Sequence, residues 1–214
     1  MQFRKVWRVR NDIRRLLYDR GRPVEDLQVL ARRLGLLLNR KYKTQFHWGP
    51  SKELDTNHLV FSGQFDCYEK HKIQIYINTH PSTKIYEFGQ EGKISWQRFV
   101  DDLSECIMHE KVHQYQWRQH KNRGKKHSRK TGNEELDYYS DPDEIDAYAW
   151  SLASEMLDTN QGFVIPGIDA TYSIWWNYAN LFDAGHPVRK RLLRKTYRRV
   201  ALAMADDVDQ FRAL

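Results

Sequence analysis

Residues 109–113, His-Glu-Lys-Val-His, carry the pattern in this chain that is best suited to chemistry. Histidines four positions apart lie on one face of a helix, so the imidazoles of His109 and His113 can share one ion. Zinc binds neutral imidazole nitrogens at about 2.0–2.1 Å, and a catalytic zinc site has three protein ligands and a water. Glu110 lies next to that face and can accept a proton from the water, whose pKa the metal lowers to about 7. The pattern predicts zinc-dependent hydrolysis with Glu110 as the general base.

The third zinc ligand must lie outside this pentapeptide. Gln116 and Gln119 stand where metzincins carry Gly and His, which excludes that class. His120 lies about 10 Å beyond His113 along a helix that rises about 1.5 Å per residue, too far to share its ion. His127 lies in a basic segment, which disfavours another cation. The acidic segment 141–149 remains as the source of the third ligand.

Residues 144–147, Glu-Ile-Asp-Ala, resemble the start of the second zinc-binding helix in the glutamate zincins, or gluzincins. Together with the segments around 23–36, 73–78 and 149–157, they look most like the ImmA/IrrE-type metallopeptidases. The resemblance spans roughly residues 20–158, and its sharpest motif is the HExxH pentapeptide. It implies a Zn²⁺ cofactor and a protein or peptide substrate, with these residues in the site: His109, His113 and Glu144 as metal ligands and Glu110 as base.

Two residues of the acidic segment have alternative readings. Tyr148 occupies the position where many gluzincins carry an Asp that orients a zinc histidine. Its hydroxyl either takes over that orienting role, or faces the substrate as an electrophile, or belongs to a core aromatic. Glu144 is the third residue of a helix that Asp141 and Pro142 would begin, so it could instead be the acid of a capping box.

Hydrophobic periodicity predicts five helices and three strands. The helices are expected over 5–19, from Pro23 to a stop at Gly35, over 95–119, from Asp141-Pro142 to 157, and from Pro187 onward. Strands are expected over 36–38, over 58–61 with an end at Gly63, and over 71–78, and residues 120–139 are expected to be a loop. The strand over 73–78 is expected to have one solvated side and an open edge that pairs with a substrate peptide.

This order of elements predicts an α+β fold. Under the resemblance it is a zincin-like, minimal gluzincin domain with a small antiparallel or mixed sheet, an active-site helix and a helical C-terminal extension. The expected division is a metallopeptidase domain over residues 1–160 and an aromatic and basic extension over 161–214 that packs on the same domain.

Charge is distributed in blocks along the chain, which has a formal net charge of +7. Residues 111–130 contain eight Lys or Arg and no acid, residues 133–150 contain seven acids and no base, and residues 189–199 contain seven bases and no acid. Such blocks either bind a partner, with nucleic acid the expected one for 111–130 and 189–199, or form a solvated surface. His186 and Arg189, at the start of the C-terminal helix, could bind an oxyanion, but His186 is expected to cap the helix instead.

The composition indicates a cytoplasmic protein with no membrane partner. No run of eighteen apolar residues occurs, and the first residues lack the apolar core of a secretion signal. Cys67 and Cys106 show no CxxC spacing, which fits a reducing compartment, and Cys106 is expected to pack as a small hydrophobic residue.

Two functional hypotheses follow from these features. The first is a zinc metallopeptidase that cleaves a specific protein target. The alternative is a basic, nucleic-acid-associated or virion-type interaction protein in which zinc is structural or vestigial. Glu110 favours the first, because a structural site needs no base, and the basic blocks favour the second.

Overall fold

The computed structural model describes residues 3–66, 72–119, 131–158 and 173–211. They form an α+β fold with seven helices and two small sheets, which confirms the predicted class. The chain divides into an N-terminal unit, residues 8–114, and a C-terminal unit, residues 1–7 with 115–214. This division does not test the predicted boundary at residue 160, which stays a prediction.

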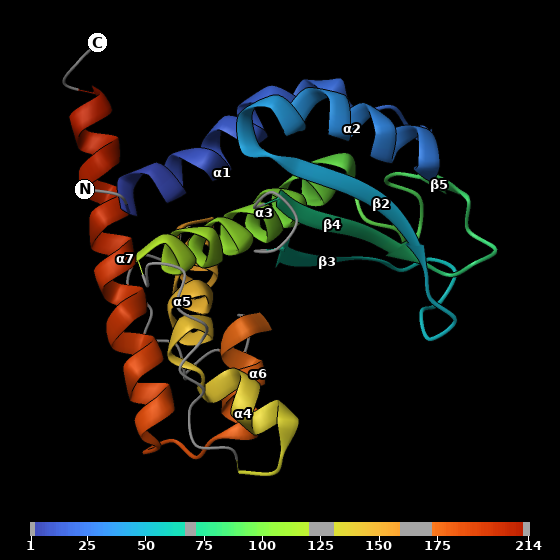
Figure 1. The fold of residues 1–214 in the computed structure, drawn as a ribbon. Coiled ribbons are helices and arrows are strands. Elements are labelled where there is room, and N and C mark those ends of the chain that lie inside the picture. The colour runs from blue at the N-terminus through green and yellow to red at the C-terminus, as the bar shows by residue number, and fades with distance from the viewer. Residues whose placement is uncertain (1–2, 67–71, 120–130, 159–172, 212–214) are drawn as a thin grey trace. The chain divides into compact units, whose positions relative to one another are not determined.

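The main sheet of the N-terminal unit is mixed. Its strands lie in the order β2 (Thr44–Pro50), β4 (Lys72–Thr79), β3 (Leu59–Asp66), with β2 parallel and β3 antiparallel to β4 (Figure 1). The alternation of β4 is confirmed, because Ile73, Ile75 and Ile77 are fully buried. The open edge expected for this strand is wrong, since β4 is central and paired on both sides. The edge strands are β2 and β3.

Helix α2 (Leu27–Tyr42) runs through the segment expected to hold the first strand. Gly35 lies inside the helix, so the expected stop there and the strand over 36–38 are both wrong. The spacing of Leu30, Leu34 and Leu38 keeps one apolar face against the core throughout, and this packing outweighs the cost of about 1 kcal/mol for an interior glycine. The helix begins after Asp26, whose side chain accepts hydrogen bonds from two backbone amides at 2.9 and 3.0 Å.

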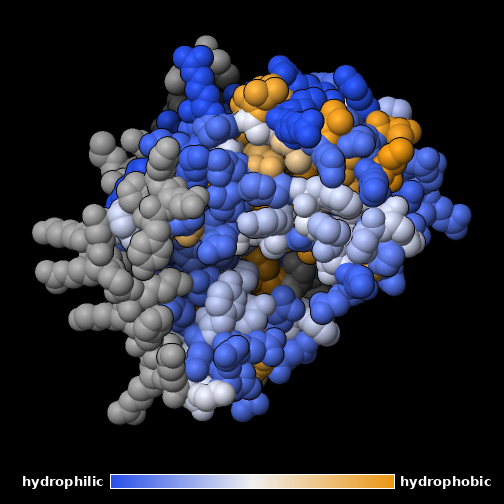
Figure 2. Space-filling view, turned by 45° about the vertical axis from the view of Figure 1, so that its right-hand side comes forward, coloured by the Kyte–Doolittle hydropathy of each residue, from blue (hydrophilic) through white to orange (hydrophobic). Residues whose placement is uncertain are grey.

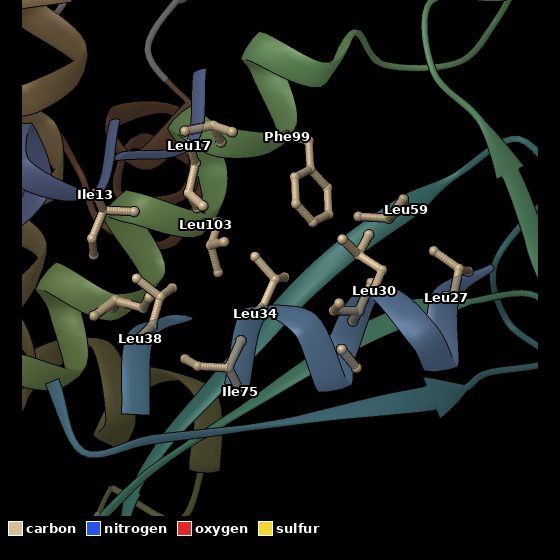
Figure 3. Close-up of a cluster of buried hydrophobic side chains, with 14 of the residues drawn as sticks. Ile13, Leu17, Leu27, Leu30, Leu34, Leu38, Leu59, Ile75, Phe99 and Leu103 are labelled. Atoms are coloured by element: carbon tan, nitrogen blue, oxygen red, sulfur yellow. The ribbon is translucent and has the colours of Figure 1, made fainter. Parts of the chain in front are cut away.

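One hydrophobic core joins the helices and the sheet of this unit. Figure 3 shows side chains of α2 pointing at Leu103 and Phe99 of α3 (Trp96–Gln119), at Ile75 of β4 and at Leu59 of β3. The core also takes Ile13 and Leu17 from α1 (Phe3–Leu17). The remaining elements of the unit are short: η1 (Tyr18–Arg20) and the antiparallel pair β1 (Val24–Asp26) and β5 (Ile85–Glu87). The strand expected over 58–61 is longer than predicted. Strand β3 runs through Gly63 instead of ending there.

The C-terminal unit is helical and holds a second core. Besides the last turns of α3 it contains α4 (Glu134–Ser140), α5 (Pro142–Asp158), α6 (Ser173–Leu181) and α7 (Pro187–Phe211). Helix α4 lies in the segment expected to be a loop, and the side chain of Asn133 caps it. The core combines Ile145 and Leu152 of α5 with Tyr178 of α6 and Leu192 of α7, so α6 and α7 pack on α5.

The start of α7 agrees with the expected His186 cap. His186 caps α7 by accepting a hydrogen bond at Nδ1 from the Val188 amide at 3.2 Å, while Arg189 stacks on Trp175 with its guanidinium carbon 4.6 Å from the ring centre. The face in Figure 2 is largely hydrophilic, with hydrophobic residues gathered near the top. Within the described part of the chain, the helices are too short or too polar to cross a membrane.

A buried ion pair joins α5 to α7. Lys195 Nζ and Arg199 Nη2 each lie 2.6 Å from Oδ1 of Asp146. Burial by itself would raise the pKa of Asp146, but the hydrogen bonds and charges of these two bases outweigh it, so the pKa is lowered from its ordinary value. The Asp146 carboxylate is therefore ionised in the folded protein at every pH at which it is ionised in the unfolded chain.

Replacing Asp146 with Ala is expected to destabilise the protein by about 3 kcal/mol, because the almost fully buried Arg199 loses its counter-ion. The Asp146 contribution is present above the unfolded pKa of about 4 and is lost as the pH falls through the lower folded pKa. Urea unfolding at pH 7 and at pH 3 measures both effects. Asp183→Ala, at an exposed position before α7, is the control, and an equal loss in both variants would contradict the assignment.

Candidate metal centre

Helix α3 carries the pentapeptide 109–113 and confirms the helix expected over 95–119. The Ser95 hydroxyl caps its start by accepting a hydrogen bond from the Arg98 amide at 3.1 Å. Its apolar side chains, among them Val100, Leu103 and Ile107, are fully buried in the core of the N-terminal unit. This packing fixes the rotation of the helix about its axis, and with it the direction of the face that carries the two histidines.

The two histidine rings of the pentapeptide direct their Nε2 atoms at one another. The Nε2 atoms of His109 and His113 are 3.1 Å apart, their ring centres are 4.8 Å apart, and both side chains are half-buried. Two nitrogens bound to one tetrahedral zinc at about 2.0–2.1 Å would be separated by about 3.3 Å. The pair is thus arranged as two ligands of one ion.

Glu110 is buried against strand β3, where a glycine makes room for it. A Cβ atom placed on Gly63 would lie 2.8 Å from Glu110 Cγ, 2.9 Å from Glu110 Oε1 and 2.9 Å from Cys106 Sγ. The side chain of Glu110 is only 6% exposed. Gly63 is therefore a residue of the candidate site that was not predicted from the sequence, where this glycine was expected to end a strand. A glycine inside a strand is itself a signal of close approach by another group.

Substituting Gly63 with Ala is expected to displace the Glu110 carboxylate and to cost about 1–3 kcal/mol in stability, as overpacking of a core does. The added methyl group overlaps both Glu110 and Cys106. The double variant Gly63→Ala/Cys106→Ala, which removes the sulfur, should regain part of the stability. Thermal unfolding measures the effect, and Gly35→Ala, with open space around its Cβ position, is the control. A Gly63→Ala protein with unchanged stability would contradict the close packing.

Cys106 packs as expected. It is partly buried and lies against the core of the N-terminal unit. Burial and the nearby charges of Glu110 and Glu105 raise the pKa of its thiol well above the ordinary value. The neutral thiol is neither a nucleophile nor a metal ligand under ordinary conditions. The other cysteine, Cys67, lies outside the described residues.

Glu144 lies in the first turn of α5 and does not complete a capping box. The Asp141 side chain caps the helix by accepting a hydrogen bond from the Asp143 amide at 2.7 Å, as expected. The Asp141 amide, which a capping-box acid would bind, donates instead to the Tyr138 carbonyl at 3.1 Å. Glu144 is only 3% exposed, and a buried carboxylate requires a cation or several donors.

The last turns of α3 are joined to the start of α5. Gln116 Nε2 donates a hydrogen bond to the carbonyl oxygen of Asp143 at 2.8 Å. Gln116 follows His113 by three residues on the same continuous helix, and Asp143 directly precedes Glu144. The ligand atoms of His109, His113 and Glu144 all lie within 4.8 Å of one another. This group could hold a metal ion.

Two other histidines considered as ligands, His120 and His127, lie outside the described residues. At the positions that exclude a metzincin, Gln116 binds the α5 backbone and Gln119 ends α3 at an exposed position. The basic segment 111–130 is described only up to Gln119. Its first base, Lys111, is buried and donates a hydrogen bond from Nζ to Gln114 Oε1 at 2.9 Å, so it does not extend a basic surface.

Tyr148 belongs to a cluster of four tyrosines in the C-terminal unit. Its hydroxyl lies 3.2 Å from that of Tyr138, and its ring is stacked on Tyr139 and perpendicular to Tyr178. Burial raises the pKa values of Tyr138, Tyr148 and Tyr178, and the charge of Glu144 raises each of them further. These hydroxyls therefore stay protonated at neutral pH. Packing explains Tyr148 as a cluster member, while its expected catalytic role stays a prediction.

The charge of Glu144 acts on Tyr138 and Tyr178, and neither residue was predicted from the sequence to belong to the site. Tyr138 also comes within hydrogen-bonding reach of the Glu144 carboxylate. The available signal was the Tyr-Tyr pair ahead of Asp141, in a segment assigned to a loop because of its charge and its glycines. Within this cluster, Tyr138 is therefore the hydroxyl that can donate to the Glu144 carboxylate.

No protein-family model matches the chain, and no curated protein sequence or solved structure matches it either.

Proposed function

We propose that this protein is a zinc-dependent metallopeptidase of the gluzincin type, similar to the ImmA/IrrE-type metallopeptidases. The observation that carries the proposal is the convergence of the His109 and His113 Nε2 atoms, 3.1 Å apart, on the helix that also carries the buried Glu110. Two imidazoles and one carboxylate are a donor set that suits zinc among the common divalent ions. The mixed sheet that precedes α3 supports a zincin-like fold.

His109, His113 and Glu144 would hold the ion, which when bound activates a water and polarises the substrate carbonyl. Glu110 accepts the proton of the attacking water on its carboxylate and later delivers it to the leaving amine. The packing of Glu110 against Gly63 limits its side chain to few orientations, and this supports a role that depends on position. The amide bond of the substrate is broken, and a carboxylate and an amine are formed.

Strand β3 is the edge that we assign to the substrate, in place of the central strand β4. Among the described residues β3 pairs with β4 alone, so its outer edge can add an extended peptide. Gly63 lies on this strand, in contact range of Glu110. A peptide bound along β3 would therefore place a carbonyl group near the general base, whereas the outer edge of β2 lies two strands away from it.

Metal-dependent cleavage tests this function. Purified protein loaded with one equivalent of zinc is incubated with a mixture of unfolded proteins, and new N-termini are identified by mass spectrometry. Cleavage is expected with zinc, absent after chelation, and restored when zinc is returned. Protein that binds one zinc with high affinity yet produces no new N-termini, either from this mixture or from an extract of its own cells, would refute the peptidase assignment.

The alternative of an interaction protein with a structural or vestigial metal site has less support around α3. A structural site has no use for a buried base that is held in place by a dedicated glycine. Nucleic-acid binding is possible whether the metal site is catalytic or structural. The residues relevant to it are the bases of the C-terminal helix α7.

A further inference from the structure

Helix α7 contains seven bases within residues 189–199, and the structure divides them into two groups. Lys195 and Arg199 bind Asp146 of α5. Arg189 donates a hydrogen bond from Nη1 to the Phe182 carbonyl at 3.1 Å and stacks on Trp175. These three bases hold the C-terminal unit together. The sequence alone did not distinguish them from the rest.

The other four bases form what we call the α7 stripe: Lys190, Arg191, Arg194 and Arg198. Three of them are exposed, and Arg191 is half-buried. The exposed bases recur every four residues, so they lie on one helix face at intervals of about 6 Å. The opposite face carries the buried Leu192, Thr196 and Val200. None of the four forms an ion pair with a described carboxylate.

We propose that the α7 stripe binds nucleic acid, namely the phosphate backbone of duplex DNA. A row of positive charges along one helix face is complementary to a polyanion such as duplex DNA, which carries one negative charge per about 1.7 Å of its axis. Arginine supplies two of the three exposed side chains, and its planar guanidinium binds phosphate oxygens in a bidentate manner. Such contacts position a protein on DNA without reading its sequence.

The composition of this face argues against an anionic membrane as the partner. A helix that lies on a membrane combines its bases with large apolar side chains that enter the lipid. Between residues 187 and 201, the exposed positions of α7 hold Pro187, Ala201 and the three bases, and beyond them Met204 is a single exposed large apolar side chain. The large apolar residues of this segment instead face the core of the C-terminal unit.

Salt-dependent binding to a fluorescein-labelled DNA duplex of arbitrary sequence tests the proposal. The test variant is Lys190→Gln/Arg194→Gln/Arg198→Gln. Each phosphate contact contributes about 0.9 to the slope of log K against log salt, so the slope should become shallower by about 2.7. The affinity should fall roughly 10²–10³-fold at about 0.1 M salt. The melting temperature should not change, since these exposed side chains form no hydrogen bond or ion pair with a described residue.

The control variant is Arg15→Gln/Arg32→Gln/Arg40→Gln, which removes the same charge from exposed positions on α1 and α2. It should change the slope far less than the α7 variant. Equal losses in both variants would show a general charge effect and overturn the proposal, as would a wild-type protein that does not bind DNA. Stripe-dependent binding to vesicles with 30% phosphatidylserine, without binding to DNA, would also overturn it. Zinc loading affects none of these outcomes, so failure here is distinct from failure of the peptidase assignment.

Discussion

Replacing Glu110 with Gln is expected to lower the rate of peptide cleavage by roughly 10²–10⁴-fold while zinc binding persists. Glutamine keeps the shape of the side chain, so its packing against Gly63 and Cys106 is preserved. It has no basic oxygen, and it therefore cannot take a proton from the attacking water. The expected result is a folded, metal-loaded and inactive protein.

The measurement is the cleavage rate at saturating substrate, together with the zinc content and the melting temperature of the same preparation. Glu91→Gln, at an exposed position of the same unit, makes the same chemical change away from the site and should leave all three quantities unaltered. A Glu110→Gln protein with one zinc and full activity would show that another group is the base. A protein that loses its zinc would assign Glu110 to the metal instead.

Replacing His113 with Ala is expected to lower the affinity for zinc by more than about 100-fold. Loss of a residue that merely supports a ligand costs about 10–100-fold, and loss of a ligand itself should cost more. Glu144→Gln should also weaken binding, because a neutral amide is a poorer zinc ligand than a carboxylate. Both substitutions should abolish the rise in melting temperature that zinc produces in the wild-type protein by binding the folded state.

Competition with a chromophoric chelator measures these affinities. His47→Ala, which removes an exposed histidine stacked on Tyr76, controls for non-specific zinc binding, and Glu135→Gln controls for the loss of a carboxylate. Unchanged affinity in His113→Ala would refute the metal centre as a whole. Unchanged affinity in Glu144→Gln alone would leave the two histidines as ligands and require a different third one.

The parts of the structure that depend on neighbouring residues could be predicted from the sequence. Helix α3 and the common face of His109 and His113 follow from an i, i+4 spacing. The start of α5 follows from Asp141 and Pro142, and the burial of Ile73, Ile75 and Ile77 from strict alternation. In each case the deciding interaction spans only a few residues.

The errors arose where packing overrides local preference. Gly35 is a poor helix residue, yet α2 continues through it because Leu30, Leu34 and Leu38 are buried on one face. The alternation of β4 is equally compatible with an edge or a central strand. Only the pairing with both β2 and β3 shows that it is central. A single strand contains no information about its neighbours in a sheet.

By itself the sequence determined which residues have the chemistry for a metal site. His109 and His113 are four positions apart, so they share one face wherever this segment is helical, and Glu110 lies next to that face. The tertiary structure alone decided what surrounds them. It placed Gly63 of strand β3 against Glu110 of helix α3, joined Gln116 to the start of α5, and separated the bases that bind Asp146 from those that face solvent. These contacts join residues far apart in the chain, and only long-range packing brings such residues together.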